Sequence, residues 1–204
     1  MPKIVDHAER REEVANAVIA VVARAGVAGV TLKSVAEEAG WSTGVINHYF
    51  DSKTDLIVTA ARHCLNQWAS LDRRTATRDA TEALRALMEA MVPIHERRMA
   101  ITRAMIAFMG EAIADDTLAE PLRAQQIHWR SLVAEVLRRG IRSGEFAEGM
   151  DVEHTADTLA ALANGLATRS AFESVDFEVQ RGLVHRWIDQ LVLAPLAAGP
   201  APEA

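Results

Sequence analysis

The sequence predicts an all-α protein of about nine helices, and three observations carry this prediction. Apolar residues recur at helical spacing along most of the 204 residues. No segment shows the alternation of apolar and polar residues that is typical of a half-buried strand. Gly and Pro residues interrupt the apolar pattern at intervals that suit the ends of helices.

Three helices are expected within the first 50 residues. The first covers about residues 8–25, and the glycines of residues 26–29 end it. The second has Thr31 as its N-cap and stops at Gly40, with four residues expected to face inward: Leu32, Val35, Ala36 and Ala39. The third opens at Ser42, a second N-cap, and ends near Tyr49. A short helix, a Gly turn and another short helix predict a helix-turn-helix.

Six more helices are expected in the remainder of the chain. Ser52 caps the fourth, and Asp55 stands three residues later, where a carboxylate completes a capping box. The others lie at about residues 79–93, 96–113, 117–143, 151–170 and 177–194. Pro93 and Gly144 mark helix ends, and Pro121 requires a position in a first turn.

The polar segment RRTATRDAT predicts an internal boundary. We expect a helix-turn-helix domain in residues 1–52, a connecting helix in residues 52–73, a second helical domain in residues 74–196, and a disordered tail in residues 197–204. The formal charge is +1 for residues 1–78 and −7 for the rest, so the acidic surplus lies in the C-terminal part.

Composition also bears on the compartment. A single cysteine, Cys64, excludes an internal disulfide and fits a reducing cytoplasm. The first residues are too polar for a signal peptide, and no apolar run reaches the roughly 18 residues of a membrane span. We therefore expect a soluble, cytoplasmic protein with no membrane partner.

The segment WSTGVINHYF, residues 41–50, gathers neutral hydrogen-bonding side chains and contains no charged residue. Such groups suit the edges of bases, and Gly44 allows the backbone to approach closely. Ser42 and Thr43 lie at a helix N-terminus, where free N–H groups favour a phosphate. Asn47 and His48 also suit a solvated helix face, and Gly44 also suits a turn, so no single residue decides the function.

The longer stretch VTLKSVAEEAGWSTGVINHYFDSKTDLI, residues 30–57, closely resembles the signature of the TetR family of bacterial transcriptional regulators. Its Asn-His-Tyr-Phe is similar to the Ser-His-Tyr-Phe of the BetI-type branch, although many members carry an aromatic residue where this chain has Asn47. The C-terminal stretches AFMGEAIADDTL, HWRSLVAEVLRRGIRSGEF and TLAALANGLATRSAF resemble that branch more weakly.

The resemblance implies a homodimeric repressor that binds palindromic double-stranded operator DNA and is released by a small-molecule effector. Carried onto matching positions, it makes four residues base-facing: Thr43, Gly44, Val45 and Asn47. It makes five others phosphate-facing: Thr31, Ser42, His48, Tyr49 and Lys53. Lys33, Arg10 and Arg11 can extend the same basic face.

Met and aromatic residues concentrate in the C-terminal part, and they suit either an adaptable ligand cavity or a plain core. The family places its effector there, and BetI-type resemblance suggests a choline- or betaine-like cation, although rings for an aromatic cage are scarce. The predicted effector-binding residues are Met91, His95, Met99, Arg103, Phe108, Glu111, Trp129 and Asn164.

Dimerisation is expected through the last two long helices. The predicted interface combines a small-residue face on one helix with apolar residues on the next: Ala160, Ala163, Ala167, Leu183, Trp187 and Leu191. The fourth helix is expected to transmit the effect of a bound effector to the DNA-binding end, and the contacts at its inner end are Leu65 and Trp68.

Other functions stay open on the same fold. The sequence lacks the common nucleotide-binding, hydrolase and zinc-protease motifs, and its seven histidines are scattered. We therefore expect no catalytic residues, no metal site and no cofactor. An activator or a ligand-independent regulator is the main alternative, and an all-α enzyme or small-molecule carrier is a remote one.

Overall fold

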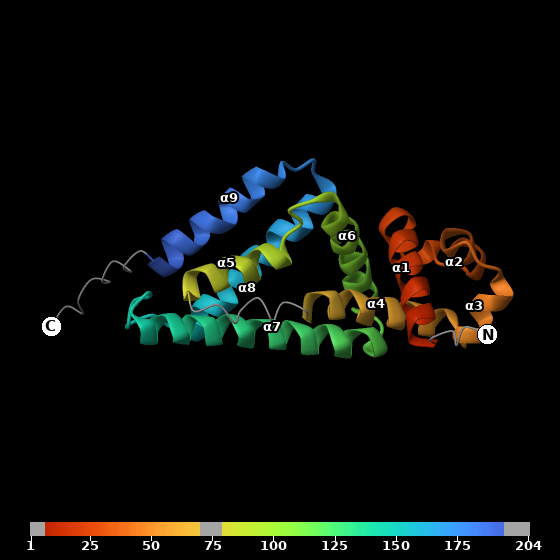
Figure 1. Cartoon of the computed structure of the whole chain (residues 1–204), viewed down its shortest axis with the longest axis horizontal. Helices are drawn as coiled ribbons and strands as arrows, with labels where there is room; N and C mark the ends of the chain where they lie inside the picture. Colours follow the sequence, from red (N-terminus) through yellow and green to blue (C-terminus); the bar gives the residue numbers. More distant parts are fainter. Residues whose placement is uncertain (1–6, 70–78, 194–204) are drawn as a thin grey trace, which may run out of the picture. The chain divides into compact units, whose positions relative to one another are not determined.

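Nine α-helices form the part of the chain that the computed structural model describes, residues 7–69 and 79–193, and no strand occurs within these ranges. The predicted all-α fold is confirmed (Figure 1). The helices are α1 (His7–Ala25), α2 (Leu32–Ala39), α3 (Thr43–Tyr49), α4 (Lys53–Ala69), α5 (Ala80–Met91), α6 (Glu96–Glu111), α7 (Asp116–Ser143), α8 (Val152–Phe172) and α9 (Phe177–Ile188). A short 3-10 helix η1 (Val27–Gly29) precedes α2, and a π-helical segment η2 (Asp189–Leu193) follows α9.

The caps of α2 and α3 are the predicted ones. Thr31 Oγ1 accepts a hydrogen bond from Ser34 N at 3.0 Å, and Ser34 Oγ accepts one from Thr31 N at 2.9 Å, which completes a capping box. Gly40 ends α2 with φ of 70°, a left-handed conformation that glycine adopts without strain. Ser42 Oγ then accepts from Val45 N at 3.3 Å and caps α3. Short-range side-chain bonds therefore determine where both short helices begin.

The first compact unit contains α1 to α4, α6 and the start of α7 up to Gln125. Helix α1 contacts α2, α4 and α6. Its buried face includes Val14, Val18 and Val22, and α4 contributes Leu56 and Ala60 to the same core. Figure 1 shows α2 and α3 beside α1, so this unit supports the two helices of the predicted helix-turn-helix.

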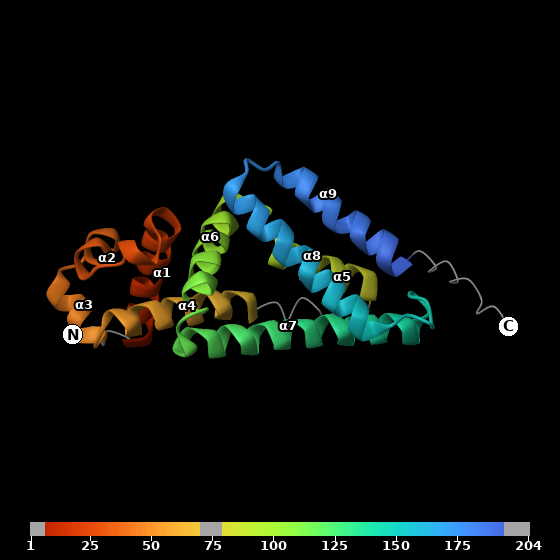
Figure 2. The ribbon, with the colours of Figure 1, turned by 180° about the vertical axis from the view of Figure 1, so that it is seen from behind.

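The second compact unit contains α5, the rest of α7, α8 and α9, and Figure 2 shows α5 beside α8 and α9. Buried polar groups connect its helices. The Gln180 side chain donates from Nε2 to the Pro93 carbonyl oxygen at 2.6 Å, and its Oε1 accepts from Ser170 Oγ at 2.5 Å. Arg85 of α5 also forms an ion pair of 3.1 Å with Asp189. These bonds hold α9 against the end of α5 and against α8.

Glu145, in the connection after α7, caps the N-terminus of α5 from a distance of 65 residues along the chain. Its carboxylate accepts from Ala80 N at 2.9 Å, from Thr81 N at 3.0 Å and from Ser143 Oγ at 2.8 Å. Burial alone would raise the pKa of Glu145, but the hydrogen bonds from Ser143, Thr81 and Ala80 outweigh it and lower the pKa to about 2. This long-range cap was absent from the sequence prediction.

Three local predictions were wrong in detail. Leu32 is 37% exposed, because the inward face of α2 is formed by Val35 and Ala36. Asp55 Oδ2 accepts from Asp51 N at 3.4 Å, so it bonds the residue before the Ser52 cap and leaves the capping box incomplete. Pro121 lies inside α7, beyond the first turn that begins at Asp116.

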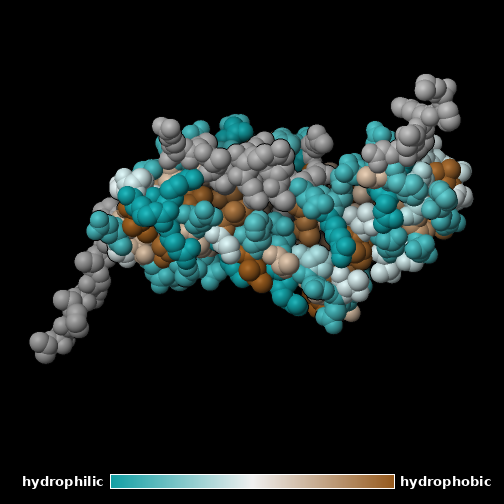
Figure 3. Space-filling view, turned by 60° about the horizontal axis from the view of Figure 1, so that its bottom comes forward, coloured by the Kyte–Doolittle hydropathy of each residue, from teal (hydrophilic) through white to brown (hydrophobic). Residues whose placement is uncertain are grey.

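Hydrophobic residues reach the surface in separate patches among hydrophilic ones on the face that Figure 3 shows. Among the described residues, no helix has both the length and the apolar character needed to cross a membrane.

Candidate nucleic-acid interface

Helix α3 exposes the residues that the sequence predicts to face bases. Thr43, Gly44, Val45 and Asn47 are exposed, whereas Ile46 is completely buried. Ile46 and the following Phe50, which is also buried, fasten this helix to its unit. The outer face of α3 therefore carries neutral donors, acceptors and one apolar side chain, and the buried face of the same helix is firmly packed. Contact with the edges of nucleobases requires such groups on a fixed helix.

The predicted phosphate-facing residues surround this face. Thr31, Ser42, His48 and Lys53 are exposed, and Tyr49 is partly exposed. Lys53 has no ion-pair partner within residues 7–69 and 79–193, so its charge is free to meet an anion. The Lys33 side chain is 83% exposed and lies 3.9 Å from Glu37 Oε1, a distance at the limit for an ion pair.

Arg11 has a different position from the one predicted for it. Its guanidinium donates to the Tyr49 carbonyl oxygen, to Asp55 Oδ1 at 3.2 Å and to Thr59 Oγ1 at 3.0 Å, and it lies 4.3 Å from the centre of the Phe50 ring. Because all these contacts are internal, Arg11 joins α1 to the end of α3 and to α4. It supports the recognition helix and is not an open basic group on its face.

An aromatic group lies at the C-terminal end of α3. The Tyr49 ring centre is 4.5 Å from that of His7, 5.2 Å from that of His48 and 6.0 Å from that of Trp41. Arg10 lies over Trp41, with its guanidinium carbon 4.9 Å from the ring centre. A groove of about 410 Å³ opens beside these rings and is lined by Arg10, Gly40, Trp41, Val45 and Tyr49.

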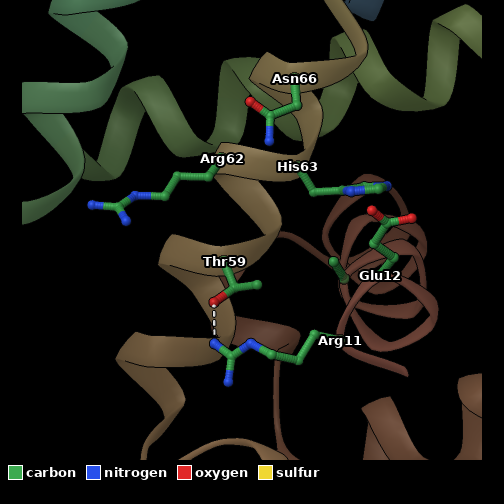
Figure 4. Close-up of a pocket in the computed structure, with 7 residues that line it drawn as sticks. Arg11, Glu12, Thr59, Arg62, His63 and Asn66 are labelled. Carbon is green, nitrogen blue, oxygen red and sulfur yellow. Dashed lines mark hydrogen bonds between the residues drawn. The ribbon is translucent and has the colours of Figure 1, made fainter. Parts of the chain in front are cut away.

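A second groove, of about 270 Å³, lies between α1 and α4 (Figure 4). Its polar lining residues are Arg11, Glu12, Thr59, Arg62, His63 and Asn66. The figure shows the Arg11 bond to Thr59 across this groove, and His63 also bonds Asn16 Oδ1 at 3.1 Å. The groove is therefore crossed by bonds that join α1 to α4.

The predicted effector-binding residues are distributed over both compact units. Met99, Arg103, Phe108 and Glu111 belong to the first unit through α6, whereas the other four belong to the second unit: Met91, His95, Trp129 and Asn164. Met99 and Arg103 share a groove of about 440 Å³, which α6 forms with α1.

Their burial also differs. Met91, Met99, Phe108 and Trp129 are buried, whereas three polar members are exposed: His95, Arg103 and Glu111. Asn164 is partly buried and donates to Gln126 Oε1 at 3.4 Å. Trp129 Nε1 is buried without a hydrogen-bond partner in the described chain, which marks it as a donor available to a ligand or a water molecule.

The apolar face of α8 and α9 differs from the predicted dimer interface by about one residue. Ala160 and Ala163 are buried within the subunit, so they cannot contact a partner, and Ala167 is partly exposed. An open groove of about 320 Å³ is lined instead by Ala161, Leu162, Gly165, Leu166, Arg169, Leu183 and Trp187. Burial therefore removes Ala160 and Ala163 from the exposed surface of α8, while the prediction of a dimer through α8 and α9 stays a prediction. The side chain of Leu191 lies outside the described residues.

Two features of the interface were missed from the sequence. His7 precedes the apolar pattern of α1 and carries no motif, so nothing in the sequence placed it beside α3. The role of Arg11 depends on a backbone carbonyl 38 residues away, which no side-chain pattern reveals.

The described residues contain no group of three or more His, Cys, Asp or Glu side chains that could hold a metal ion. Cys64 is fully buried in α4, and burial raises the pKa of its thiol to about 12. This thiol is therefore a core group without reactivity at neutral pH.

Known families match both halves of the chain. Residues 16–62 match the family described as bacterial regulatory proteins, tetR family, and residues 80–193 match the BetI-type transcriptional repressor, C-terminal family. The HTH-type transcriptional regulator BetI of Burkholderia mallei (strain NCTC 10229) is 34% identical over 205 residues, which cover 96% of this chain and 99% of that one. The chain belongs to the TetR family of transcriptional regulators.

Solved TetR-like structures share the fold. A putative transcriptional regulator from Saccharomonospora viridis, in complex with choline, has a TM-score of 0.83 at 21% identity and covers 92% of this chain and 100% of its own. The regulator FadR from Bacillus subtilis, in complex with stearoyl-CoA, has a TM-score of 0.71 at 17% identity and covers 87% and 97%. These two neighbours bind chemically different ligands on one fold, so the fold alone does not determine an effector.

Proposed function

We propose that this TetR-family regulator is a cytoplasmic repressor that binds a palindromic operator as a homodimer and leaves it when a small-molecule effector binds. The observation that carries the proposal is the exposed face of α3, where neutral side chains stand on a helix fixed by Ile46, Phe50 and Arg11. Residues 1–52 are assigned to DNA binding, α4 to the connection, and residues 74–196 to the effector and the partner subunit.

Base reading and backbone contact are assigned to different side chains. Thr43, Gly44, Val45 and Asn47 face base edges, since they are exposed together on α3. Thr31, Ser42, His48, Tyr49 and Lys53 face phosphates, with Lys33 as a further cation. The separation follows from chemistry, because neutral amides and hydroxyls distinguish bases, whereas charge attracts every phosphate equally.

The dimer forms through the exposed apolar face of α8 and α9. Leu183, Trp187 and the groove residues of α8 provide apolar area that no described residue of the same subunit covers. Two such faces related by a two-fold axis form a four-helix bundle. In that dimer the two α3 helices enter successive major grooves, about 34 Å apart.

The effector binds in the C-terminal domain and acts through α4. Trp129 Nε1 and Asn164 are the groups that orient it. Leu65 is buried near the C-terminal end of α4, so its contacts would change if the packing there changed. Trp68 was predicted to act in the same way, but its side chain lies outside the described residues. A ligand shifts the equilibrium only by its differential affinity for the two states, typically about 1 to 3 kcal/mol.

The DNA-binding part is tested by titrating the full chain against the duplex upstream of its own gene and against a scrambled duplex of equal length. Lys53→Ala should weaken binding to both duplexes and reduce the salt slope by about 0.9 for each phosphate that the lysine neutralises in the wild type. Equal affinity for both duplexes at every salt concentration, in the wild type, would contradict the proposal.

The effector part is tested by a thermal-shift screen of metabolites and cationic compounds, choline and betaine included, with and without the duplex. An effector at about a hundred times its Kd should stabilise the free protein by about 2.7 kcal/mol. By reciprocity it should bind the DNA complex less tightly. A compound that binds both forms equally, by calorimetry, is not an effector of this switch.

A further inference from the structure

Two imidazole rings lie close together at the C-terminal end of α3, one from α3 itself and one from α1. His7 is the first residue of α1, and His48 is in the last turn of α3. Their ring centres are 5.9 Å apart, and both rings lie against Tyr49, at 4.5 Å for His7 and 5.2 Å for His48. Both histidines are exposed.

Neither imidazole is neutralised by a carboxylate within the described chain. Two carboxylates on these elements are engaged in ion pairs, since Arg10 binds Glu13 at 2.8 Å and Arg11 binds Asp55 at 3.2 Å. The other charged or titratable groups on the same elements are the Tyr49 phenol, exposed Glu9 and Glu12 of α1, Arg24 in the last turn of α1, and exposed Asp51 and Lys53 around the start of α4. Both rings are therefore accessible to a ligand beside the side chains assigned to phosphates.

We propose that His7 is an additional DNA-backbone contact and that, with His48, it forms an imidazole pair whose protonation strengthens operator binding. This inference rests on the proposed DNA-binding function and extends the interface from α3 to the first residue of α1. The ligand is the phosphate backbone, so the pair adds affinity for every sequence and leaves base preference unchanged.

The physical reason is the charge state of imidazole. Histidine gains its proton between about pH 5 and 8, and the cation then has two N–H donors. With the ring centres 5.9 Å apart, one phosphate can accept hydrogen bonds from both imidazolium rings, and its negative charge attracts both cations. Phosphate binding therefore favours uptake of protons, and a fall in pH favours DNA binding.

The experiment is a fluorescence-anisotropy titration of labelled operator duplex with the full-length protein at pH 5.5, 6.5, 7.5 and 8.5, each at several salt concentrations. We expect operator affinity to rise about tenfold from the highest pH to the lowest, with a salt slope that grows by about 0.9 for each imidazolium that meets a phosphate. A scrambled duplex should show the same pH dependence at lower affinity.

Three variants separate charge from packing. His7→Gln should flatten the pH dependence by about half, and His7→Phe should flatten it equally while it keeps the ring contact with Tyr49. His154→Gln is the matched control, because His154 is an exposed histidine of α8 outside the first unit, and it should retain the wild-type profile. Thermal melts of each variant at each pH show whether the fold is intact.

The outcomes distinguish this inference from the function on which it rests. If the wild type binds the operator and His7→Gln has the same pH profile and salt slope, the His7 contact is wrong and the DNA-binding function stands. If His7→Gln weakens binding equally at all four pH values, His7 only packs against Tyr49, and the titrating pair is refuted. If the wild type binds no duplex specifically at any pH, the proposed function itself fails.

Discussion

The outward faces of α3 and of the α8–α9 pair differ in the chemistry they expose. Helix α3 presents Thr43, Gly44 and Asn47, whereas the groove on α8 and α9 presents Leu162, Leu183 and Trp187. A neutral polar face is well solvated by water and can exchange that water for base edges. An apolar face is stabilised by being covered, which favours a second protein surface. The two faces thus indicate two kinds of partner on one helical scaffold.

The largest expected effect concerns the apolar face. Trp187→Glu places a charge in the proposed dimer interface, so we expect monomers and a loss of operator affinity of at least about 100-fold, because each monomer holds a single recognition helix. Sedimentation velocity measures the mass, and anisotropy measures the affinity. Arg186→Glu, an exposed neighbour outside the groove, is the control and should remain dimeric. An unchanged dimer for Trp187→Glu would place the interface on another surface.

The next effect sharpens the contrast between the two sides of α3. Ile46→Ala should lower the free energy of unfolding by about 2 to 5 kcal/mol, because Ile46 is completely buried and its removal leaves a cavity. Val45→Ala, one residue earlier and 40% exposed, should change it by less than about 0.5 kcal/mol. Chemical denaturation measures both. Equal effects would mean that α3 is not held through Ile46.

A third prediction tests whether the polar face of α3 contributes to operator affinity and not to the free energy of unfolding. Asn47→Ala should cost about 1 to 3 kcal/mol of operator binding per half-site and relax the preference at one base pair. Its free energy of unfolding should stay within about 0.5 kcal/mol of wild type, since the side chain is exposed. Binding to a set of single-substitution operators measures the first quantity. A uniform loss across all operators would reassign Asn47 to the backbone.

The smallest effect concerns the caps, which are local in α2 and α3, whereas α5 combines the local cap of Asp79 with the long-range one of Glu145. Glu145→Gln should lower the free energy of unfolding at pH 7 by about 1 kcal/mol, a value reduced for the partial exposure of the group. The pKa of Glu145 is lowered to about 2, so the stabilisation is present above the ordinary glutamate pKa and is lost as pH falls toward 2. Denaturation between pH 7 and 2 should show a shallower acid decline for the variant. Parallel curves would contradict the cap.

The sequence predicted the ends of helices better than it predicted which of their sides are buried. Thr31, Gly40 and Ser42 set the ends of α2 and α3 because capping depends on residues three or four positions apart. The residues proposed to face DNA belong to a dense motif within the same short range, and the structure exposes Thr43, Val45 and Asn47 among them. In contrast, the exposed face of α8 was misplaced at Ala160 and Ala163, because alanine fits a buried contact and an open face equally well. Arg11 and Glu145 make their bonds across 38 and 65 residues, and no local pattern encodes such partners.

The predicted effector-binding residues differ in their surroundings. Met and aromatic residues were grouped by composition, and the structure divides them between two compact units. Phe108 and Trp129 prove to be fully enclosed side chains, so a Met-rich or aromatic composition records packing as readily as binding.

The Arg11 bond to the Tyr49 carbonyl oxygen has a consequence for how operator preference can diverge. Every amino acid has a main-chain carbonyl oxygen, so the hydrogen bond from Arg11 does not depend on which side chain occupies position 49. It also does not depend on the exposed side chains of α3. Residues 43, 44, 45 and 47 can therefore be exchanged while Arg11, Ile46 and Phe50 keep the helix seated. Under the proposed assignment of these four positions to base edges, gene duplication followed by substitution there would give regulators with new DNA sites, and the same four positions are the ones to randomise when retargeting this protein in the laboratory.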